Sequence, residues 1–207
     1  MKLPELIIIG TRNAHKIEEI NDKLRGLLPE FKGLDAYPDA PDVVEDGKTF
    51  LKNVSKKAGE LARATGEWVM ADDSGLEVDA LSGAPGVFSA RYAGSHGDYE
   101  GNNRKLLREM AGIPAEKRTA RFRCVIALAK PGGEIVFTVE GAMEGLIAEK
   151  PKGKHGFGYD PVFYLPDREC MVAELTLEEK NQISHRARAV EAFREKLLSL
   201  SRKGDSY

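Results

Sequence analysis

The sequence predicts an α/β fold in which helices flank a central mixed β-sheet and the chain forms two lobes. Residues 6–9 and 68–71 are continuously apolar, which is typical of strands buried on both faces of a sheet. Residues 121–128 instead alternate large apolar side chains with arginines or smaller residues, in the period-two pattern of a strand. Helical patterns separate the first strands, so parallel βα units followed by a hairpin indicate a mixed sheet.

The first half of the chain contains three regions with apolar residues at helical spacing. Asn13 suits the N-cap of the first, because its side chain can accept a hydrogen bond from the first turn. The expected helices cover residues 14–28, 49–65 and 98–110. An acidic, proline-containing loop over 35–47 precedes the second helix, and residues 76–81 are expected to continue extended beyond the strand at 68–71.

The second half begins with a hairpin around the Pro-Gly-Gly turn at 131–133. The strands of this part are expected at 121–128, 135–139 and 141–148. A glycine-rich loop over 151–160 follows. Thr176 and Glu179 form a capping-box pair that predicts the start of a short helix. A long C-terminal helix is expected to begin near His185.

Composition excludes several classes of protein. The chain has 207 residues, with 31 Lys and Arg against 33 Asp and Glu, and is expected to form one two-lobed domain over 1–207. This charge balance argues against a nucleic-acid partner, which requires surplus basic residues. The lack of a long apolar run argues against membrane insertion, and no signal peptide is evident. Cys124 and Cys170 form no CxxC motif, so we expect a reducing, cytoplasmic environment.

The first candidate site joins the first strand to the first helix and comprises Thr11, Arg12, Asn13, Ala14, His15 and Lys16. Backbone N–H groups and the helix dipole favour an anion at a helix N-terminus, and Lys16 can reach a phosphate. The glycine–lysine motif of a P-loop is absent. The alternative is an ordinary capped helix with a solvated lysine.

The second candidate site is the adjacent pair Asp72 and Asp73, expected at the end of the strand at 68–71 and followed by Ser74. Two carboxylates near a core are unfavourable unless a cation compensates them, and Mg²⁺ takes oxygen ligands. Ligands collect at the carboxyl ends of strands, so Lys16 and Asp73 are expected at one edge of the sheet. The alternative is a structural turn, for which Asp-Ser-Gly is also suitable.

The third candidate site is the loop over 153–160, which contains Phe157 and Tyr159. Glycines let the backbone approach a ligand closely, and aromatic faces can stack on a nucleobase. The alternative is a glycine-rich loop with two packed aromatic rings.

A fourth candidate group contains Lys180, His185 and Arg186, which flank the junction of two predicted helices and can bind an anion or a carbonyl oxygen. The alternative is a solvated helix surface. Glu45, in the acidic loop, is a further candidate metal ligand. Together the four groups suit a nucleoside triphosphate.

Five sequence blocks occur in a fixed order: TRNAHK (11–16), ADDSGL (71–76), GAPGVFSARY (83–92), GFGYDPVF (156–163) and EEKNQISHR (178–186). In this order they resemble the inosine/xanthosine triphosphate pyrophosphatase family over nearly the whole chain. The resemblance implies an elongated two-lobed subunit, usually a homodimer. It also implies Mg²⁺-dependent hydrolysis of non-canonical purine nucleoside triphosphates (ITP, dITP and XTP) to the monophosphate and pyrophosphate, which removes deaminated purines.

The resemblance further implies roles for single residues. Asp73 would be the general base and, with Glu45, a metal ligand, and Asp72 and Lys16 would assist catalysis. Substrate would be bound by Thr11, Arg12, Asn13, Ala14, His15, Lys16, Ser74, Phe157, Gly158, Tyr159, Asp160, Lys180, His185 and Arg186. Two positions depart from the family pattern, since Lys52 and Val44 stand where acids are common.

The expected reaction is attack of water on the α-phosphorus, with Lys16 and Lys180 stabilising the leaving pyrophosphate. A donor such as Arg186 would favour the 6-keto group of hypoxanthine or xanthine over the 6-amino group of adenine. Two alternatives stay open. One is a pyrophosphatase for another modified nucleotide, and the other is a nucleotide-binding sensor without activity.

Overall fold

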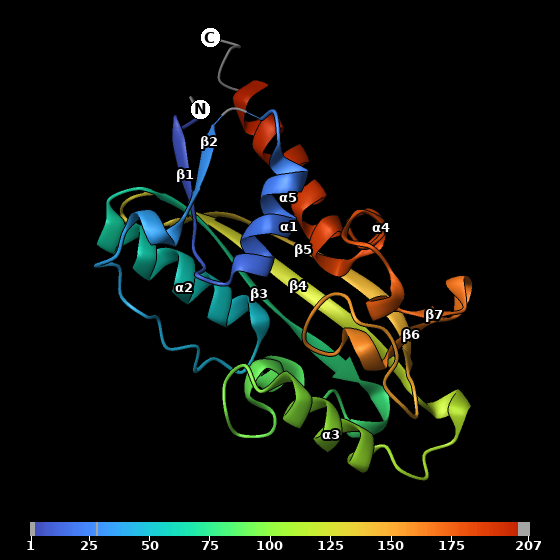
Figure 1. Ribbon diagram of the computed structural model, residues 1–207. Helices are drawn as coiled ribbons and strands as arrows, with labels where there is room; N and C mark the ends of the chain where they lie inside the picture. Colours follow the sequence, from blue (N-terminus) through green and yellow to red (C-terminus); the bar gives the residue numbers. More distant parts are fainter. Residues whose placement is uncertain (1–2, 28, 203–207) are drawn as a thin grey trace. The chain divides into compact units, whose positions relative to one another are not determined.

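The computed structural model describes residues 3–27 and 29–202 (Figure 1). Its strands form one sheet in the order β2-β1-β3-β4-β5-β6-β7. They are β1 (Leu6–Ile9), β2 (Glu30–Gly33), β3 (Trp68–Val78), β4 (Thr119–Ala129), β5 (Ile135–Ile147), β6 (Phe163–Leu165) and β7 (Cys170–Met171). β1 is parallel to β2 and β3, whereas β6 is antiparallel to β5 and β7. The predicted α/β class with a mixed sheet is therefore confirmed.

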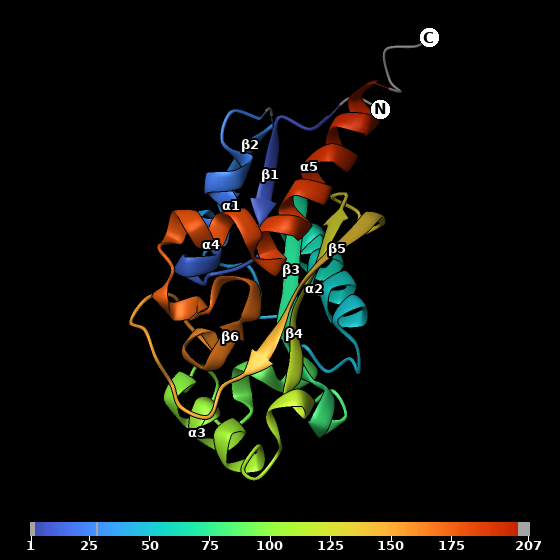
Figure 2. The ribbon, with the colours of Figure 1, turned by 90° about the vertical axis from the view of Figure 1, so that its right-hand side faces the viewer.

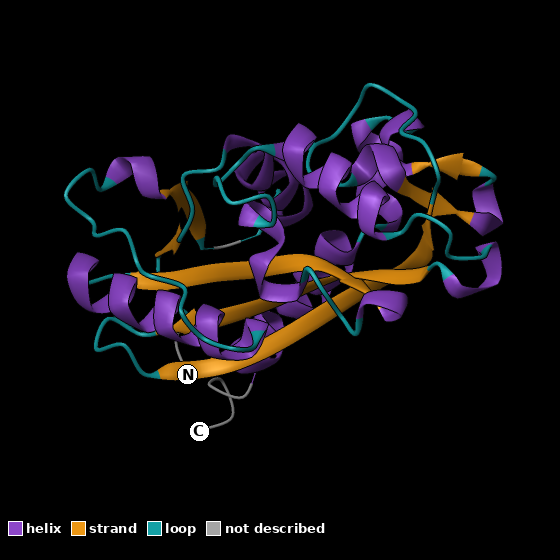
Figure 3. Ribbon diagram, turned by 90° about the horizontal axis from the view of Figure 1, so that it is seen from below, coloured by secondary structure: helices purple, strands orange, loops and turns teal. Residues whose placement is uncertain are grey.

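Figure 3 shows the helices in purple, and most of them begin after a residue whose side chain caps the first turn. They are α1 (Ala14–Leu24), α2 (Phe50–Thr65), α3 (Tyr99–Glu109), α4 (Leu177–Ile183) and α5 (His185–Arg202). The side chains of Asn13, Thr49 and Thr176 each accept a hydrogen bond from the backbone N–H three residues later. Each bond satisfies one of the N–H groups that a helix start leaves without an intrahelical partner.

Three boundaries differ from the expectation. α1 ends at Leu24 because Gly26 adopts a left-handed φ of 81°, which stops a helix; the expected end at residue 28 lies outside the described residues. β3 continues through Asp72 and Asp73 to Val78, and a 3-10 turn over Asp79–Leu81 replaces the expected extended segment. β5 is one strand rather than two.

The chain divides into two compact units. Unit 1 consists of Met1–Asp73, Cys124–Gly141 and Arg186–Tyr207, and unit 2 consists of Ser74–Arg123 and Ala142–His185. The strands β3, β4 and β5 each contribute residues to both units.

The sheet of unit 1 is covered by helices on both faces. α1 and α5, which lie side by side in Figure 1, pack on one face in a core that includes Ile9, Met70 and Phe193. On the other face, Leu61 of α2 meets Val69 near Gly10. A Cβ at residue 10 would lie 3.0 Å from Leu61 Cδ1 and 3.1 Å from Val69 Cγ1, so this close packing favours glycine.

Unit 2 has its own core and contains α3, drawn in green in Figure 2, and α4. The core is built from side chains of several elements, including Leu76, Leu106, Phe122, Phe163 and Leu175. Within the described residues, no helix has the length and apolar character that crossing a membrane requires.

Candidate active site

The loop between β1 and α1 is fixed by local hydrogen bonds. The N–H of Gly10 donates to the carbonyl of Met70 at 2.7 Å, which keeps the loop beside β3. Thr11 Oγ1 accepts from the N–H of Asn13 at 3.2 Å, and Asn13 Oδ1 accepts from the N–H of Lys16 at 3.3 Å. Lys16 therefore lies in the first turn of α1, and the loop before it is held against β3.

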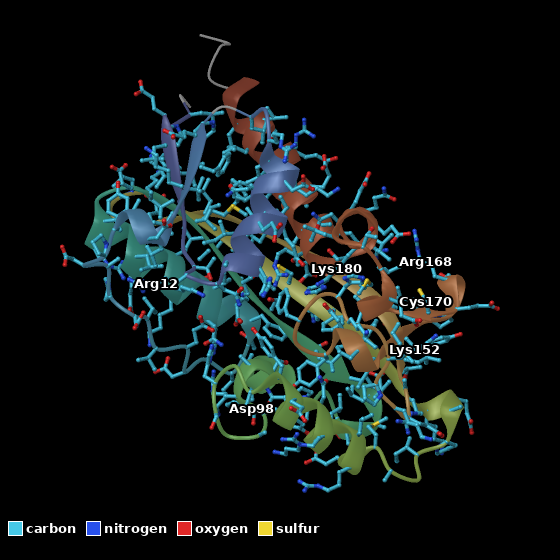
Figure 4. All side chains as sticks on the ribbon, viewed as in Figure 1. Arg12, Asp98, Lys152, Arg168, Cys170 and Lys180 are labelled. Atoms are coloured by element: carbon cyan, nitrogen blue, oxygen red, sulfur yellow. The ribbon has the colours of Figure 1, made fainter. Side chains whose placement is uncertain are left out.

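Arg12 contacts the acidic loop. Its Nη1 donates to Asp42 Oδ1 at 2.7 Å and its Nη2 to the carbonyl of Ala40 at 2.8 Å. Arg12 is labelled in Figure 4. Ala14 and His15 are exposed in the first turn of α1. Arg12 thus ties the acidic loop to the β1–α1 loop, a role that its sequence position did not indicate.

A buried network of alternating charges surrounds Asp72. Lys16 Nζ lies 2.8 Å from Asp72 Oδ2, and Arg186 Nε lies 3.5 Å from the same oxygen. Arg186 Nη1 also donates to Glu19, on the next turn of α1. Burial alone would raise the pKa of Asp72, but the positive charges of Lys16, Arg186 and Lys57 hold that pKa well below its usual range. The expected meeting of Lys16 with this segment of β3 is confirmed.

Asp72 and Asp73 do not form the paired carboxylates that adjacency suggested. They lie inside β3, where successive side chains point to opposite faces. Asp72 shares the face of Met70 with α1 and α5, whereas Asp73 shares the face of Val69 with α2. Strand alternation separates the two side chains and Asp72 already has two cations, so Asp73 is the carboxylate of the pair that remains for a further cation.

Asp73 is 6% exposed and has a different electrostatic environment. Burial and the negative charge of Glu45 raise its pKa to about 6, against the opposing effects of Lys16 and Asn53. Among the described residues, Asp73 Oδ2 has no hydrogen-bond partner. A buried carboxylate with a free oxygen and a pKa near neutrality can accept a proton or bind a cation.

Lys57 is a candidate site residue that the sequence analysis missed. Its Nζ lies 2.8 Å from Glu45 Oε1 and 3.4 Å from the carbonyl oxygen of Asp72. One turn earlier on α2, Asn53 Oδ1 accepts from the N–H of Gly47 at 2.7 Å. These two α2 residues fix the end of the acidic loop and therefore the position of Glu45. The signal in the sequence was their i,i+4 spacing on the helix that follows the acidic loop.

The oxygen donors near α2 suit a hard cation. Mg²⁺ is commonly held by one or two carboxylates together with water and substrate phosphate. Glu45 and the free Oδ2 of Asp73 provide such a donor set, and Lys57 Nζ lies 2.8 Å from Glu45. No group of three or more His, Cys, Asp or Glu in the described chain is arranged as a complete metal cage.

In unit 2, the loop over residues 157–160 forms a second cluster. Asp160 Oδ2 accepts from the backbone N–H of Phe157 at 2.9 Å and from Lys180 Nζ at 2.8 Å. Lys180, labelled in Figure 4, also lies 4.6 Å from the centroid of the Phe157 ring. Lys180 of the fourth candidate group therefore contacts the loop of the third group within unit 2. Its buried ion pair with Asp160 places its ammonium over the face of the Phe157 ring.

His185 and Ser74 also belong to unit 2. The ring of His185 stacks on Phe122, with centroids 4.8 Å apart and planes at 13°. Arg186, the next residue, belongs to the network around Asp72 in unit 1. Ser74 is partly buried within β3. The neighbours His185 and Arg186 therefore have different surroundings, although the sequence analysis assigned them a joint role.

Comparisons with known proteins agree with this description. The model of the Ham1 family matches residues 7–196, and the chain belongs to that family. A dITP/XTP pyrophosphatase from Geobacter sulfurreducens is 49% identical over 92% of this chain and 96% of its own length. One from Geobacillus kaustophilus is 53% identical over 89% of this chain and 90% of its own. The resemblance found in the sequence is confirmed.

Solved structures give the same result for the fold. A HAM1 protein from Coxiella burnetii superposes with a TM-score of 0.86 at 40% identity, covering 94% of this chain and 98% of its own. The Staphylococcus aureus Ham1 protein gives 0.84 at 38% identity, with the same coverage.

Proposed function

We propose that this protein is a nucleoside triphosphate pyrophosphatase that hydrolyses dITP, XTP and ITP to the monophosphate and pyrophosphate. Family membership and relatives of 49–53% identity named dITP/XTP pyrophosphatase support this assignment. The observation that carries it is the environment of Asp73, a buried carboxylate with a free oxygen and a raised pKa near Glu45 and Lys16.

In unit 1, Lys16 and Lys57 supply positive charge for the triphosphate, with Thr11, Arg12, Asn13, Ala14 and His15 around the helix start as further substrate-binding residues. Asp72 holds the Lys16 ammonium through its 2.8 Å ion pair. Asp73 orients the attacking water and accepts its proton, for which a pKa of about 6 is well suited. Asp73 and Glu45 would hold Mg²⁺, which when bound would supply positive charge for the phosphate oxygens.

In unit 2, we assign Phe157, Gly158, Tyr159 and Asp160 to the nucleoside and Lys180 to phosphate, with Ser74 as a further contact. His185 and Arg186 are proposed to read the base. Arg186 pairs with Glu19 through Nη1 and with Asp72 through Nε, so an N–H of its guanidinium outside these contacts would have to reach the 6-keto oxygen. We further propose a cytoplasmic homodimer, which light scattering of the purified protein would test for its oligomeric state.

The test is a pyrophosphate-release assay with ITP, dITP, XTP, GTP and ATP, each with Mg²⁺ and with EDTA. We expect Mg²⁺-dependent release from the first three nucleotides and much slower release from GTP and ATP. Release at equal rates from all five would contradict the assigned selectivity. No release from any of them, with nucleotide still bound, would indicate a sensor instead.

A further inference from the structure

Helix α3 supports the loop over residues 157–160 with two side chains one turn apart. Tyr99 packs against Phe157, with ring centroids 6.0 Å apart and planes at 46°. Asn103 Nδ2 donates to the carbonyl of Gly158 at 2.9 Å. Residues at i and i+4 share a helix face, so one face of α3 contacts two successive residues of the loop.

The next loop residue is held by a neighbouring segment that α3 also anchors. Tyr159 Oη donates to the carbonyl of Ser89 at 2.9 Å, and Asn102 Nδ2 donates to the same carbonyl at 3.3 Å. Ser89 Oγ accepts from the N–H of Leu76 at 2.8 Å, which fixes Ser89 to β3. Phe157, Gly158 and Tyr159 are thus each attached, directly or through Ser89, to α3.

The contact at Gly158 fixes a backbone conformation that the loop needs. Gly158 has a left-handed φ of 65°, and hydrogen bonding of its carbonyl to Asn103 fixes the orientation of the following peptide. Asn103 Oδ1 is buried and has no partner among the described residues. An unpaired buried acceptor is unfavourable, so Asn103 contributes less to stability than its hydrogen bond suggests.

We propose that Tyr99 and Asn103 are positioning residues that hold the Phe157 ring in the orientation required to bind the nucleotide. The inference rests on the proposed function, because it gives this loop the nucleoside. The ring lies against Lys180, and the backbone of Phe157 is bound to Asp160. Lys180 belongs to α4 and not to the loop, so a loosened loop would shift the stacking face and leave the cation and the reacting groups of unit 1 in place. Substrate binding would then weaken without a matching loss of turnover.

The test compares four variants by steady-state kinetics with ITP. Asn103→Asp keeps the size of the side chain but removes the N–H donor, and Tyr99→Leu removes the ring. Each is expected to raise KM by about three- to tenfold, the effect of one lost hydrogen bond or ring contact, with kcat within about twofold. Tyr99→Phe keeps the ring, and Arg104→Ala removes a side chain that is 66% exposed on the same helix, so both controls should retain the wild-type KM.

A role in folding alone would lower the melting temperature and the active fraction, and therefore kcat, without changing KM. An unchanged KM in either Asn103→Asp or Tyr99→Leu overturns the inference; if the former does not fold, Tyr99→Leu decides. If the wild-type protein hydrolyses no nucleotide, the proposed function fails first. The inference is then tested by calorimetric titration of the variants with IMP, where wild-type affinity in Tyr99→Leu overturns it.

Discussion

Asp72 and Asp73 are consecutive residues whose carboxylates point to opposite faces of β3. Asp72 lies on the α1 and α5 face, 2.8 Å from Lys16, and Asp73 lies on the α2 face near Glu45. Cations hold the pKa of Asp72 low, whereas burial raises that of Asp73 to about 6. One strand therefore presents two carboxylates of different acidity, an arrangement that assigns separate acid–base roles.

Replacement of the proposed base, Asp73, is expected to lower turnover while the protein still folds. Asp73→Asn should lower kcat for ITP by ~10²–10⁴-fold, because an amide cannot accept the proton of the attacking water. The measurement is pyrophosphate release at saturating ITP and Mg²⁺. Asp167→Asn, at an exposed position of unit 2, is the matched control and should keep wild-type turnover. Near-normal turnover in Asp73→Asn would remove Asp73 from this role.

The raised pKa of Asp73 predicts how stability depends on pH without metal. Its folded pKa of about 6 exceeds the ordinary value of 3.8, so the folded state binds the proton more tightly than the unfolded state. The contribution of Asp73 therefore makes the protein less stable as pH rises from about 4 to about 6, by up to ~3 kcal/mol, and is constant above that.

Asp73→Asn should remove this contribution, so the variant should exceed the wild type in stability at pH 7 more than at pH 4.5. Urea denaturation in EDTA measures both differences. Asp72 does not interfere within this window, because its pKa is lowered and its stabilising charge is lost only under more acidic conditions. An equal difference at the two pH values would show that Asp73 is not the titrating group.

In the absence of metal, the positive charge of Lys57 is expected to stabilise Glu45 in part as a bound metal would. Lys57→Met leaves Glu45 without its 2.8 Å partner and should lower the unfolding free energy in EDTA by about 1–3 kcal/mol. Added Mg²⁺ should then stabilise the variant more than the wild type, because a ligand stabilises the state that binds it more tightly.

Thermal unfolding with and without Mg²⁺ measures this difference. The matched control is Lys56→Met, whose partner Asp46 is exposed, so its removal should leave the unfolding free energy close to that of the wild type. If Mg²⁺ stabilises both variants and the wild type equally, the carboxylates near Lys57 do not bind the metal.

Arg186 should be essential for the stability of unit 1. Arg186→Met leaves the buried carboxylates of Glu19 and Asp72 without this partner, and such a loss typically costs about 3–5 kcal/mol. Chemical denaturation measures the change. The double variant Glu19→Leu/Arg186→Met removes one of the stranded charges and should be more stable than Arg186→Met. A double variant that is less stable would show that Glu19 has a separate stabilising partner.

Local interactions made much of the fold predictable. Asn13 and Thr176 cap helices through bonds to residues three positions away, so the sequence contains both partners. The apolar runs in β1 and β3 identify buried strands for the same reason, because burial on both faces determines their composition. The end of α1 was harder to predict from the sequence, since it depends on the conformation of Gly26 rather than on a change in hydrophobic pattern.

The site was predictable in its residue types and less so in its contacts. Asp72 and Asp73 looked like the end of a strand because two carboxylates inside one are unfavourable without distant cations. Those cations, Lys16 and Arg186, come from the two ends of the chain. Lys57 was missed because its partner, Glu45, lies in a loop without regular structure.

The division of the chain into two units limits how one unit could be exchanged between related proteins. The chain passes between them after Asp73, Arg123, Gly141 and His185, so neither unit is a continuous stretch of sequence. Recombination at any single junction would assemble unit 1 from two parents, and recombination after Arg123 or Gly141 would do the same to unit 2. A crossover after Asp73, Arg123 or Gly141 would also take the proposed base from one parent and the loop for the nucleoside from the other. We therefore expect single-crossover chimaeras of related proteins to be less active than either parent.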